Sequence, residues 1–250
     1  MTAGTIIKQS APDPTATPAG PQIHTRSANN AAKGDRSAAR TERSKIQADS
    51  VHYLGTTALR PNHPEVKALR RQGHQPSIHG TKVWRSSFVV MKYLKRNPIP
   101  ERAKVMDIGC GWGLTGIYLA KRYQARVTGI DADASVQPYL DAQARVNKVS
   151  IHFENKSIER IRRHEMRGFH TLVGSDVCFW DELVDPLYNL VTRAADVGVR
   201  QILIADPGRS PFWELARRCE SRFGGTVQEL SIRKPCKTRK HILVLRPNGA

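Results

Sequence analysis

The chain has few cysteines, no long apolar run and few acidic residues, and each shortage excludes a class of protein. Cys110, Cys178, Cys219 and Cys236 are scattered and form no C-x-x-C pair, which argues against a disulfide framework and a zinc site. No run of 18 apolar residues occurs, so the sequence predicts no membrane span. We therefore expect a cytoplasmic protein in a reducing setting, with no metal centre.

The shortage of acidic residues leaves 40 lysines and arginines against 22 aspartates and glutamates, a net charge of +18. Such a balance indicates an acidic partner, and the charge alone leaves open whether it is nucleic acid, an acidic protein surface or anionic lipid. Basic residues occur along the whole chain, for example at Arg70-Arg71, Arg162-Arg163 and 237–240, and no single block dominates. A nucleic-acid partner therefore stays open without being favoured.

Composition divides the chain into three parts. Residues 1–50 hold too few large apolar side chains to offset the entropy of ordering, so we predict a disordered basic tail there. Residues 51–80 are predicted to form a helical, transitional segment, in which a short helix opens at Pro64. The ordered domain is predicted to span residues 81–250.

Short apolar runs alternate with amphipathic stretches through the predicted domain. Five runs read as buried strands, each followed by a helix, and they span residues 105–108, 126–130, 150–153, 171–175 and 199–205. Alternating strands and helices imply a parallel sheet with helices on both faces. A further helix through residues 88–94 precedes the first strand, with Ser86 or Ser87 as its expected N-cap.

The end of the chain follows a different pattern. Two runs of alternating apolar residues, 226–232 and 241–245, have no room for a helix between them, so they are predicted to form an antiparallel hairpin. The predicted fold class is α/β: a Rossmann-like seven-stranded sheet with five parallel strands, a C-terminal antiparallel hairpin and helices on both faces.

The first predicted strand runs into a glycine-dense turn, Asp107-Ile108-Gly109-Cys110-Gly111-Trp112-Gly113, and then into a helix. This arrangement favours a nucleotide ligand, because glycines let the backbone approach closely and the helix start offers free N–H groups. Gly111, Gly113 and Gly116 also match the dinucleotide pattern G-x-G-x-x-G, with Asp131 about 20 residues further on. However, Asp107 would repel a pyrophosphate, whereas it suits a ligand that carries an ammonium and a sulfonium.

This turn resembles the first motif of class I S-adenosylmethionine (SAM)-dependent methyltransferases, which also have five parallel strands and a terminal hairpin. A dinucleotide-binding fold would carry a sixth parallel strand with its helix, so the end of the chain also favours SAM. The resemblance implies SAM as the cofactor, with both ribose hydroxyls bound by Asp131. The residues implied to bind SAM are Trp84, Asp107, Gly109, Cys110, Gly111, Gly113, Asp131, Ala132, Ser157, Ile158 and Ser175. For Trp84, a core position against the following helix is the alternative.

The end of the fourth strand carries Asp176-Val177-Cys178-Phe179, where ligands of open α/β sheets bind. This segment resembles the (D/E)-x-x-(Y/F) motif of seven-stranded protein-lysine methyltransferases. Asp206-Pro207-Gly208-Arg209 resembles the group that methylates the β-subunit of electron-transfer flavoprotein. The resemblance implies that Asp176 orients an acceptor ammonium and that Phe179 lines its methylene stem. Asp176 as a cap of the following helix is the alternative.

The function implied by this resemblance is methyl transfer from SAM to a lysine side chain of a protein substrate, by a monomeric enzyme. A small-molecule or RNA methyltransferase on the same fold is the main alternative. A module that binds SAM without catalysis and an oxidoreductase also stay open.

Overall fold

The computed structural model describes residue 1, residues 49–76 and residues 79–247. The predicted disordered tail falls almost wholly on residues 2–48 and so lies outside the described residues. No helix within the described ranges combines the length and apolar character needed to cross a membrane.

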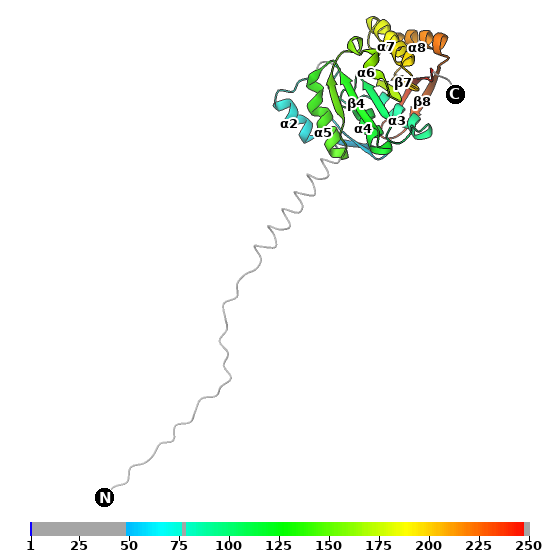
Figure 1. Cartoon of the computed structure of the whole chain (residues 1–250). Coiled ribbons are helices and arrows are strands. Elements are labelled where there is room, and N and C mark those ends of the chain that lie inside the picture. The colour runs from blue at the N-terminus through cyan, green and yellow to red at the C-terminus, as the bar shows by residue number, and fades with distance from the viewer. Residues whose placement is uncertain (2–48, 77–78, 248–250) are drawn as a thin grey trace. The chain divides into compact units, whose positions relative to one another are not determined.

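A seven-stranded sheet in the order β5-β4-β3-β6-β7-β9-β8 forms the centre of the domain (Figure 1). Its strands are β3 (Lys104–Ile108), β4 (Arg126–Asp131), β5 (His152–Asn155), β6 (Thr171–Ser175), β7 (Gln201–Asp206), β8 (Thr226–Ile232) and β9 (Thr238–Leu245). The first five strands are parallel, whereas β9 runs antiparallel to both β7 and β8. This arrangement confirms the predicted fold class.

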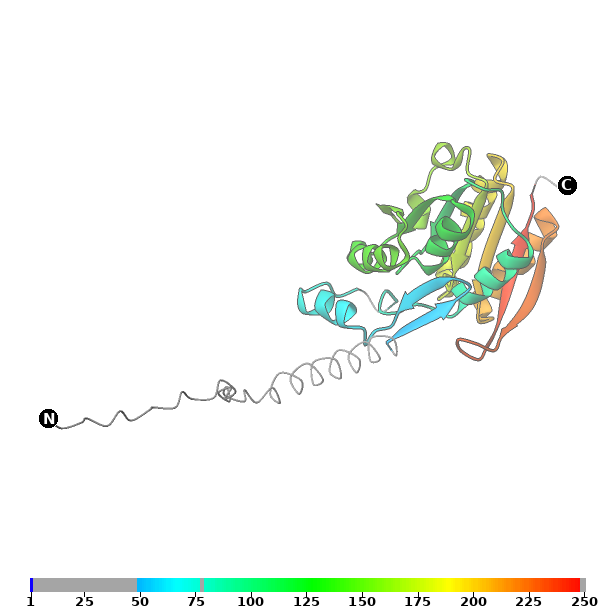
Figure 2. The ribbon, with the colours of Figure 1, turned by 90° about the horizontal axis from the view of Figure 1, so that it is seen from below.

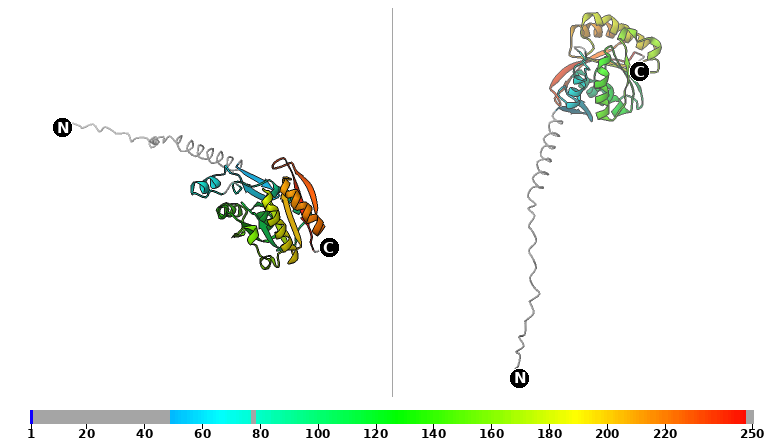
Figure 3. Two further views of the ribbon diagram at one scale, coloured as in Figure 1. Left: turned by 90° about the horizontal axis from the view of Figure 1, so that it is seen from above. Right: turned by 90° about the vertical axis from the view of Figure 1, so that its left-hand side faces the viewer.

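Helices cover both faces of the sheet, which explains why the central strands are almost continuously apolar (Figures 1 and 3). Successive residues of β3 point to opposite faces: Val105 packs in the core under α3 and α4, whereas Met106 packs in the core under α7 and α8. The helices on the first side are α3 (Ser86–Arg96), α4 (Leu114–Tyr123) and α5 (Gln137–Asn147). Those on the second side are α6 (Arg163–Met166), α7 (Val184–Asp196) and α8 (Ser210–Phe223).

A small hairpin that the sequence analysis missed precedes the sheet. Strands β1 (Ser50–Tyr53) and β2 (Thr56–Leu59) pair antiparallel, and helix α2 (Pro64–Arg71) follows them. The prediction for residues 51–80 therefore needs correction, because α2 is the only helix in the part of that range that the structure describes. The hairpin also lies on the side of the sheet that carries α3, α4 and α5, within the same compact unit as the sheet (Figure 2). The boundary predicted at residue 81 is therefore too late.

Two side-chain amides of α5 take the place of a neighbouring strand for β2. The Gln143 side chain accepts from the Leu59 N–H at 2.9 Å and donates to the Leu59 carbonyl at 3.0 Å. Asn147 pairs with Thr57 in the same way, at 2.8 and 2.7 Å. Both amides are almost fully buried, so each satisfies a backbone N–H and a C=O that would otherwise have no partner.

Replacing Gln143 by alanine is expected to destabilise the protein by about 2 kcal/mol or more, because a buried backbone donor and acceptor both lose their partner. The midpoint of urea unfolding measures this loss. Gln137→Ala is the matched control, since Gln137 is an exposed residue of the same helix and its loss should cost less than about 0.5 kcal/mol. Equal midpoints for the two variants would show that the amide pairing contributes no stability.

The start of α3 differs from the prediction. Either Ser86 or Ser87 was expected to cap this helix, but Arg85 occupies the N-cap position and both serines lie buried within the first turn. The Ser86 N–H instead donates to a carboxylate oxygen of Asp176, at 3.0 Å. The cap therefore comes from the end of β6, 90 residues further along the chain.

Candidate active site

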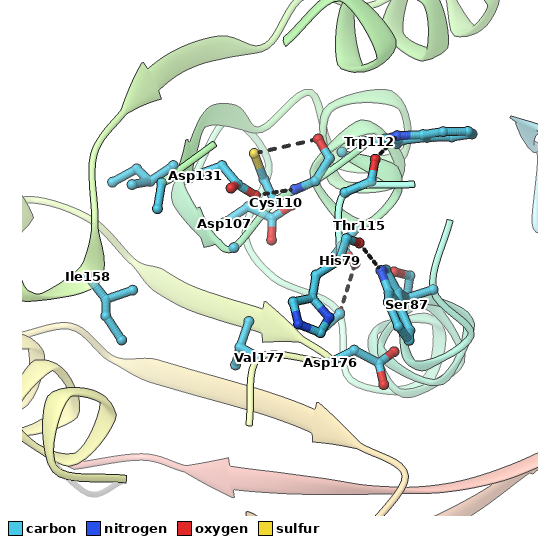
Figure 4. A pocket seen from close by; sticks show the side chains of 18 of the residues that line it. His79, Ser87, Asp107, Cys110, Trp112, Thr115, Asp131, Ile158, Asp176 and Val177 are labelled. Atoms are coloured by element: carbon cyan, nitrogen blue, oxygen red, sulfur yellow. Dashed lines mark hydrogen bonds between the residues drawn. The ribbon is translucent and has the colours of Figure 1, made fainter. Parts of the chain in front are cut away.

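A pocket with a volume of about 250 Å³ lies at the carboxyl ends of the parallel strands (Figure 4). All eleven predicted cofactor residues line it: Trp84, Asp107, Gly109, Cys110, Gly111, Gly113, Asp131, Ala132, Ser157, Ile158 and Ser175. The two predicted catalytic residues, Asp176 and Phe179, line it as well. The structure therefore brings the predicted residues together, and their individual roles stay predictions.

The glycine loop between β3 and α4 takes a backbone path that side chains disfavour. Gly109, Gly111 and Gly113 all have positive φ angles, of 57°, 51° and 73°. At Gly109, a Cβ atom would also lie only 2.7 Å from Cγ1 of Val177. The loop can therefore wrap closely around a ligand at the N-terminus of α4, where free N–H groups gather.

Asp107 lies buried beneath this loop. One of its carboxylate oxygens accepts a hydrogen bond from the Gly116 N–H at 3.0 Å. Burial raises the pKa of the Asp107 carboxyl to about 7, the Gly116 hydrogen bond opposes this shift, and the negative charge of Asp131 adds to it. A cation in the pocket would favour the ionised form of this carboxyl.

Asp131, at the end of β4, anchors the loop from the other side. Its two carboxylate oxygens accept from the Gly111 N–H at 2.9 Å and from the Asp133 N–H at 3.0 Å. Burial raises its pKa, and these backbone hydrogen bonds oppose the shift. An ionised carboxylate accepts about four hydrogen bonds, so both oxygens keep acceptor capacity for ligand hydroxyls.

Asp176 belongs to a buried charge network that links the ends of β6 and β7. Arg209 lies 3.6 Å from Asp176 and 2.6 Å from Asp206. Asp206 is fully buried and also accepts from the Gly208 and Arg209 N–H groups, at 2.9 Å each. The segment Asp206-Pro207-Gly208-Arg209 thus holds a guanidinium beside Asp176. Burial raises the pKa of Asp176, while the Ser86 hydrogen bond and nearby cations lower it.

Aromatic rings surround the end of the pocket that holds Asp176. Trp84 is half-buried and meets Phe179 edge to face, with ring centroids 5.3 Å apart, and the Arg209 guanidinium lies 4.4 Å from the Phe179 ring centroid. Trp180 follows Phe179 in the chain, with ring centroids 5.8 Å apart, and 53% of its surface is exposed. Figure 4 shows Asp176 near this end, across the pocket from the glycine loop that carries Cys110. Trp84 therefore faces the pocket instead of being confined to the core.

Several pocket residues escaped the sequence analysis. Trp112 is buried, stacks on Tyr139 with centroids 5.0 Å apart, and donates to the Gly80 carbonyl at 2.7 Å. Its position between Gly111 and Gly113 could have indicated that it lies beside the pocket. Thr115 bonds the Ser175 hydroxyl at 3.1 Å. His79 stands in a segment that was assigned outside the domain, so nothing local pointed to it.

Residues 105–195 match a protein family described as a methyltransferase domain. The electron transfer flavoprotein beta subunit lysine methyltransferases of Danio rerio and Homo sapiens are 26% and 25% identical to the chain, over 136 and 130 residues. Each match covers 52% of this chain, and 50% and 49% of those proteins. The chain thus spans about half the length of the curated relatives it matches.

Among solved structures, TrmN from Thermus thermophilus resembles the chain in fold, with a TM-score of 0.53 and 13% sequence identity. The match covers 64% of this chain and 48% of that one.

The domain match over residues 105–195, together with the fold and the pocket, supports a class I SAM-dependent methyltransferase domain. It resembles the electron transfer flavoprotein beta subunit lysine methyltransferases, and its cofactor is SAM. The pocket fits this cofactor, because it combines a carboxylate suited to ribose hydroxyls, a second buried carboxyl suited to a cation and a close-fitting glycine loop. The dinucleotide alternative does not explain the C-terminal hairpin or the position of Asp107.

SAM binding is expected to strengthen as the pH rises towards 7 and then to level off. Below about 7, the Asp107 carboxyl is mostly protonated, and a cationic ligand must displace that proton. Affinity should fall by up to about tenfold for each pH unit below this value. Titration calorimetry in buffers of different ionisation enthalpy measures both the affinity and the proton release. Asp107→Asn cannot titrate, so a slope that persists in this variant would assign the pH dependence to another group.

Proposed function

We propose that the protein transfers the methyl group of SAM to the side-chain amine of a lysine in a protein substrate. The observation that carries the proposal is the composition of the pocket end around Asp176 and Phe179. A buried carboxylate lines the pocket there together with the aromatic rings of Trp84 and Phe179, and the neighbouring Trp180 is exposed. A lysine side chain has matching parts: a cationic end and an apolar stem.

Each residue has a physical task in this proposal. Bound SAM supplies a methyl group on a positively charged sulfur. The negative charge of Asp176 attracts the acceptor ammonium, and Phe179 and Trp84 line the methylene stem and exclude water. Most of the rate gain then comes from alignment of the amine nitrogen with the methyl carbon.

The surroundings of the pocket support a large substrate. None of the described residues 49–76 lines it, so the hairpin and α2 do not form a roof over it, whereas His79 and Gly80 at the end of the same segment belong to its wall. The relatives named as lysine methyltransferases support the same acceptor class. The excess of positive charge suits an acidic protein surface around the target lysine.

Transfer of radiolabel tests the proposal. The purified protein is incubated with methyl-labelled SAM and a cell extract, and samples are then treated with protease or with nuclease. We expect label in a macromolecular fraction that protease removes and nuclease leaves intact, and an Asp131→Ala variant should lose this labelling. Label that nuclease removes would indicate an RNA substrate, and label only in small molecules would indicate a metabolite. Either result would contradict the proposal.

A further inference from the structure

His79 lies at the end of the pocket where Asp176 is predicted to orient the acceptor amine, which we call the acceptor end. Its ring is close to those of Trp84 and Phe179. Its ring stacks on Phe179 with centroids 3.9 Å apart and a tilt of 31°, and it meets Trp180 edge-on at 4.7 Å. Its carbonyl accepts the indole N–H of Trp84 at 2.7 Å, which holds the His79 backbone beside the pocket. Figure 4 shows the imidazole in the pocket wall together with Asp176 and Val177.

Both ring nitrogens of His79 are shielded from solvent, yet neither has a hydrogen-bond partner among the described residues. A buried polar group without a partner is costly, and a ring that serves only for stacking would lose nothing as phenylalanine. Burial lowers the pKa of His79, and the positive charge of Arg209 lowers it further. The ring is therefore neutral near pH 7 and carries one N–H and one lone pair.

Asp176 is less free to handle the acceptor than its place in the motif suggests. One of its oxygens accepts the Ser86 N–H, and the other lies near the Arg209 guanidinium. Its charge can attract an ammonium, but its lone pairs are partly engaged in holding α3 and α8 in place. A second, uncharged acceptor beside Asp176 would therefore help to orient a neutral amine.

We propose that His79 binds the reacting amine, by accepting a hydrogen bond from its N–H through the ring lone pair. This assignment rests on the proposed function. The acceptor lysine first loses one proton to solvent, and His79 then holds the neutral amine so that the nitrogen lone pair faces the methyl carbon. The N–C bond forms as the S–C bond breaks, and the products are a methylated ammonium and the neutral thioether.

Two substitutions separate hydrogen bonding from stacking. His79→Phe keeps an aromatic ring on Phe179 but has no acceptor, whereas His79→Gln loses the ring but keeps an oxygen that accepts an N–H bond. With saturating SAM and the protease-sensitive acceptor fraction of the extract, we expect His79→Phe to transfer methyl about a hundredfold more slowly than wild type. His79→Gln should recover at least tenfold of that loss.

SAM affinity and melting temperature, measured on both variants, should stay close to those of wild type, because the assignment concerns the acceptor and not the cofactor. An active His79→Phe with an impaired His79→Gln would overturn the assignment in favour of stacking alone, and so would loss of SAM binding in both variants. If wild type itself puts no label into protein, the proposed function fails and the assignment to a lysine amine fails with it. Equal protein labelling by wild type and His79→Phe overturns only the role of His79.

Discussion

Asp131→Ala is expected to weaken SAM binding at least a hundredfold. The variant lacks the two charge-assisted hydrogen bonds that Asp131 is predicted to make with the ribose, each worth about 1.5–3 kcal/mol. A total of about 3 kcal/mol already corresponds to roughly a hundredfold in affinity. The carboxylate also accepts the Gly111 N–H, so its loss additionally loosens the glycine loop that is predicted to contact the cofactor. Titration calorimetry at a fixed pH above 7 measures the change.

Asp133→Ala is the matched control for this measurement. Asp133 lies two residues further on and its carboxylate caps the short turn at Ala134–Val136, but it does not line the pocket. We expect its SAM affinity to stay within about threefold of wild type, because a local cap contributes mainly about 1 kcal/mol of stability. Unchanged affinity in Asp131→Ala would contradict the proposed ribose contact.

Asp176→Asn is expected to lower the rate of methyl transfer about a hundredfold while the melting temperature changes little. Asp176 has a φ of +58°, a left-handed conformation that asparagine tolerates better than other side chains. The asparagine oxygen can still accept the Ser86 N–H and cap α3. What the variant loses is negative charge, which is the property assigned to the acceptor step. Initial rates at saturating SAM, beside thermal unfolding, measure the two effects separately.

Asp176→Ala completes the comparison. It also removes the acceptor for the Ser86 N–H, which the asparagine keeps, so we expect lower stability as well as low activity. If Asp176→Asn is as active as wild type and Asp176→Ala is merely less stable, the carboxylate serves only as a cap. A cap of the following helix was the alternative expected from the sequence, whereas in the structure Asp176 caps α3, which lies earlier in the chain.

Much of the fold could be predicted because its signals are local. The strands at 171–175 and 226–232 were placed with the observed bounds, since apolar runs between turns define buried strands. The hairpin at Ser50–Leu59 was missed because its strands have four residues each and β2 is completed by two amides of α5. No local pattern reveals a pairing of that kind.

The candidate site likewise contains residues that local sequence patterns predicted and residues that they did not. Residues of the glycine loop and the strand ends were predicted because parallel strands deliver their carboxyl ends to one edge of the sheet. The position of His79 against Phe179, and the hydrogen bond that the Ser86 N–H donates to Asp176, both join segments about 90 residues or more apart in sequence. Such contacts follow from tertiary packing, so the sequence around each residue carries no sign of them.

The most direct test of the account is the chemical identity of the methylated group. Protein labelled by the purified enzyme with methyl-labelled SAM is hydrolysed in acid, and its amino acids are separated by chromatography. The account predicts that the label elutes with Nε-methylated lysine and is absent from a parallel reaction with Asp131→Ala. Label that elutes with methylated arginine or histidine, or that is released by mild base as methanol from an ester, would contradict the lysine assignment.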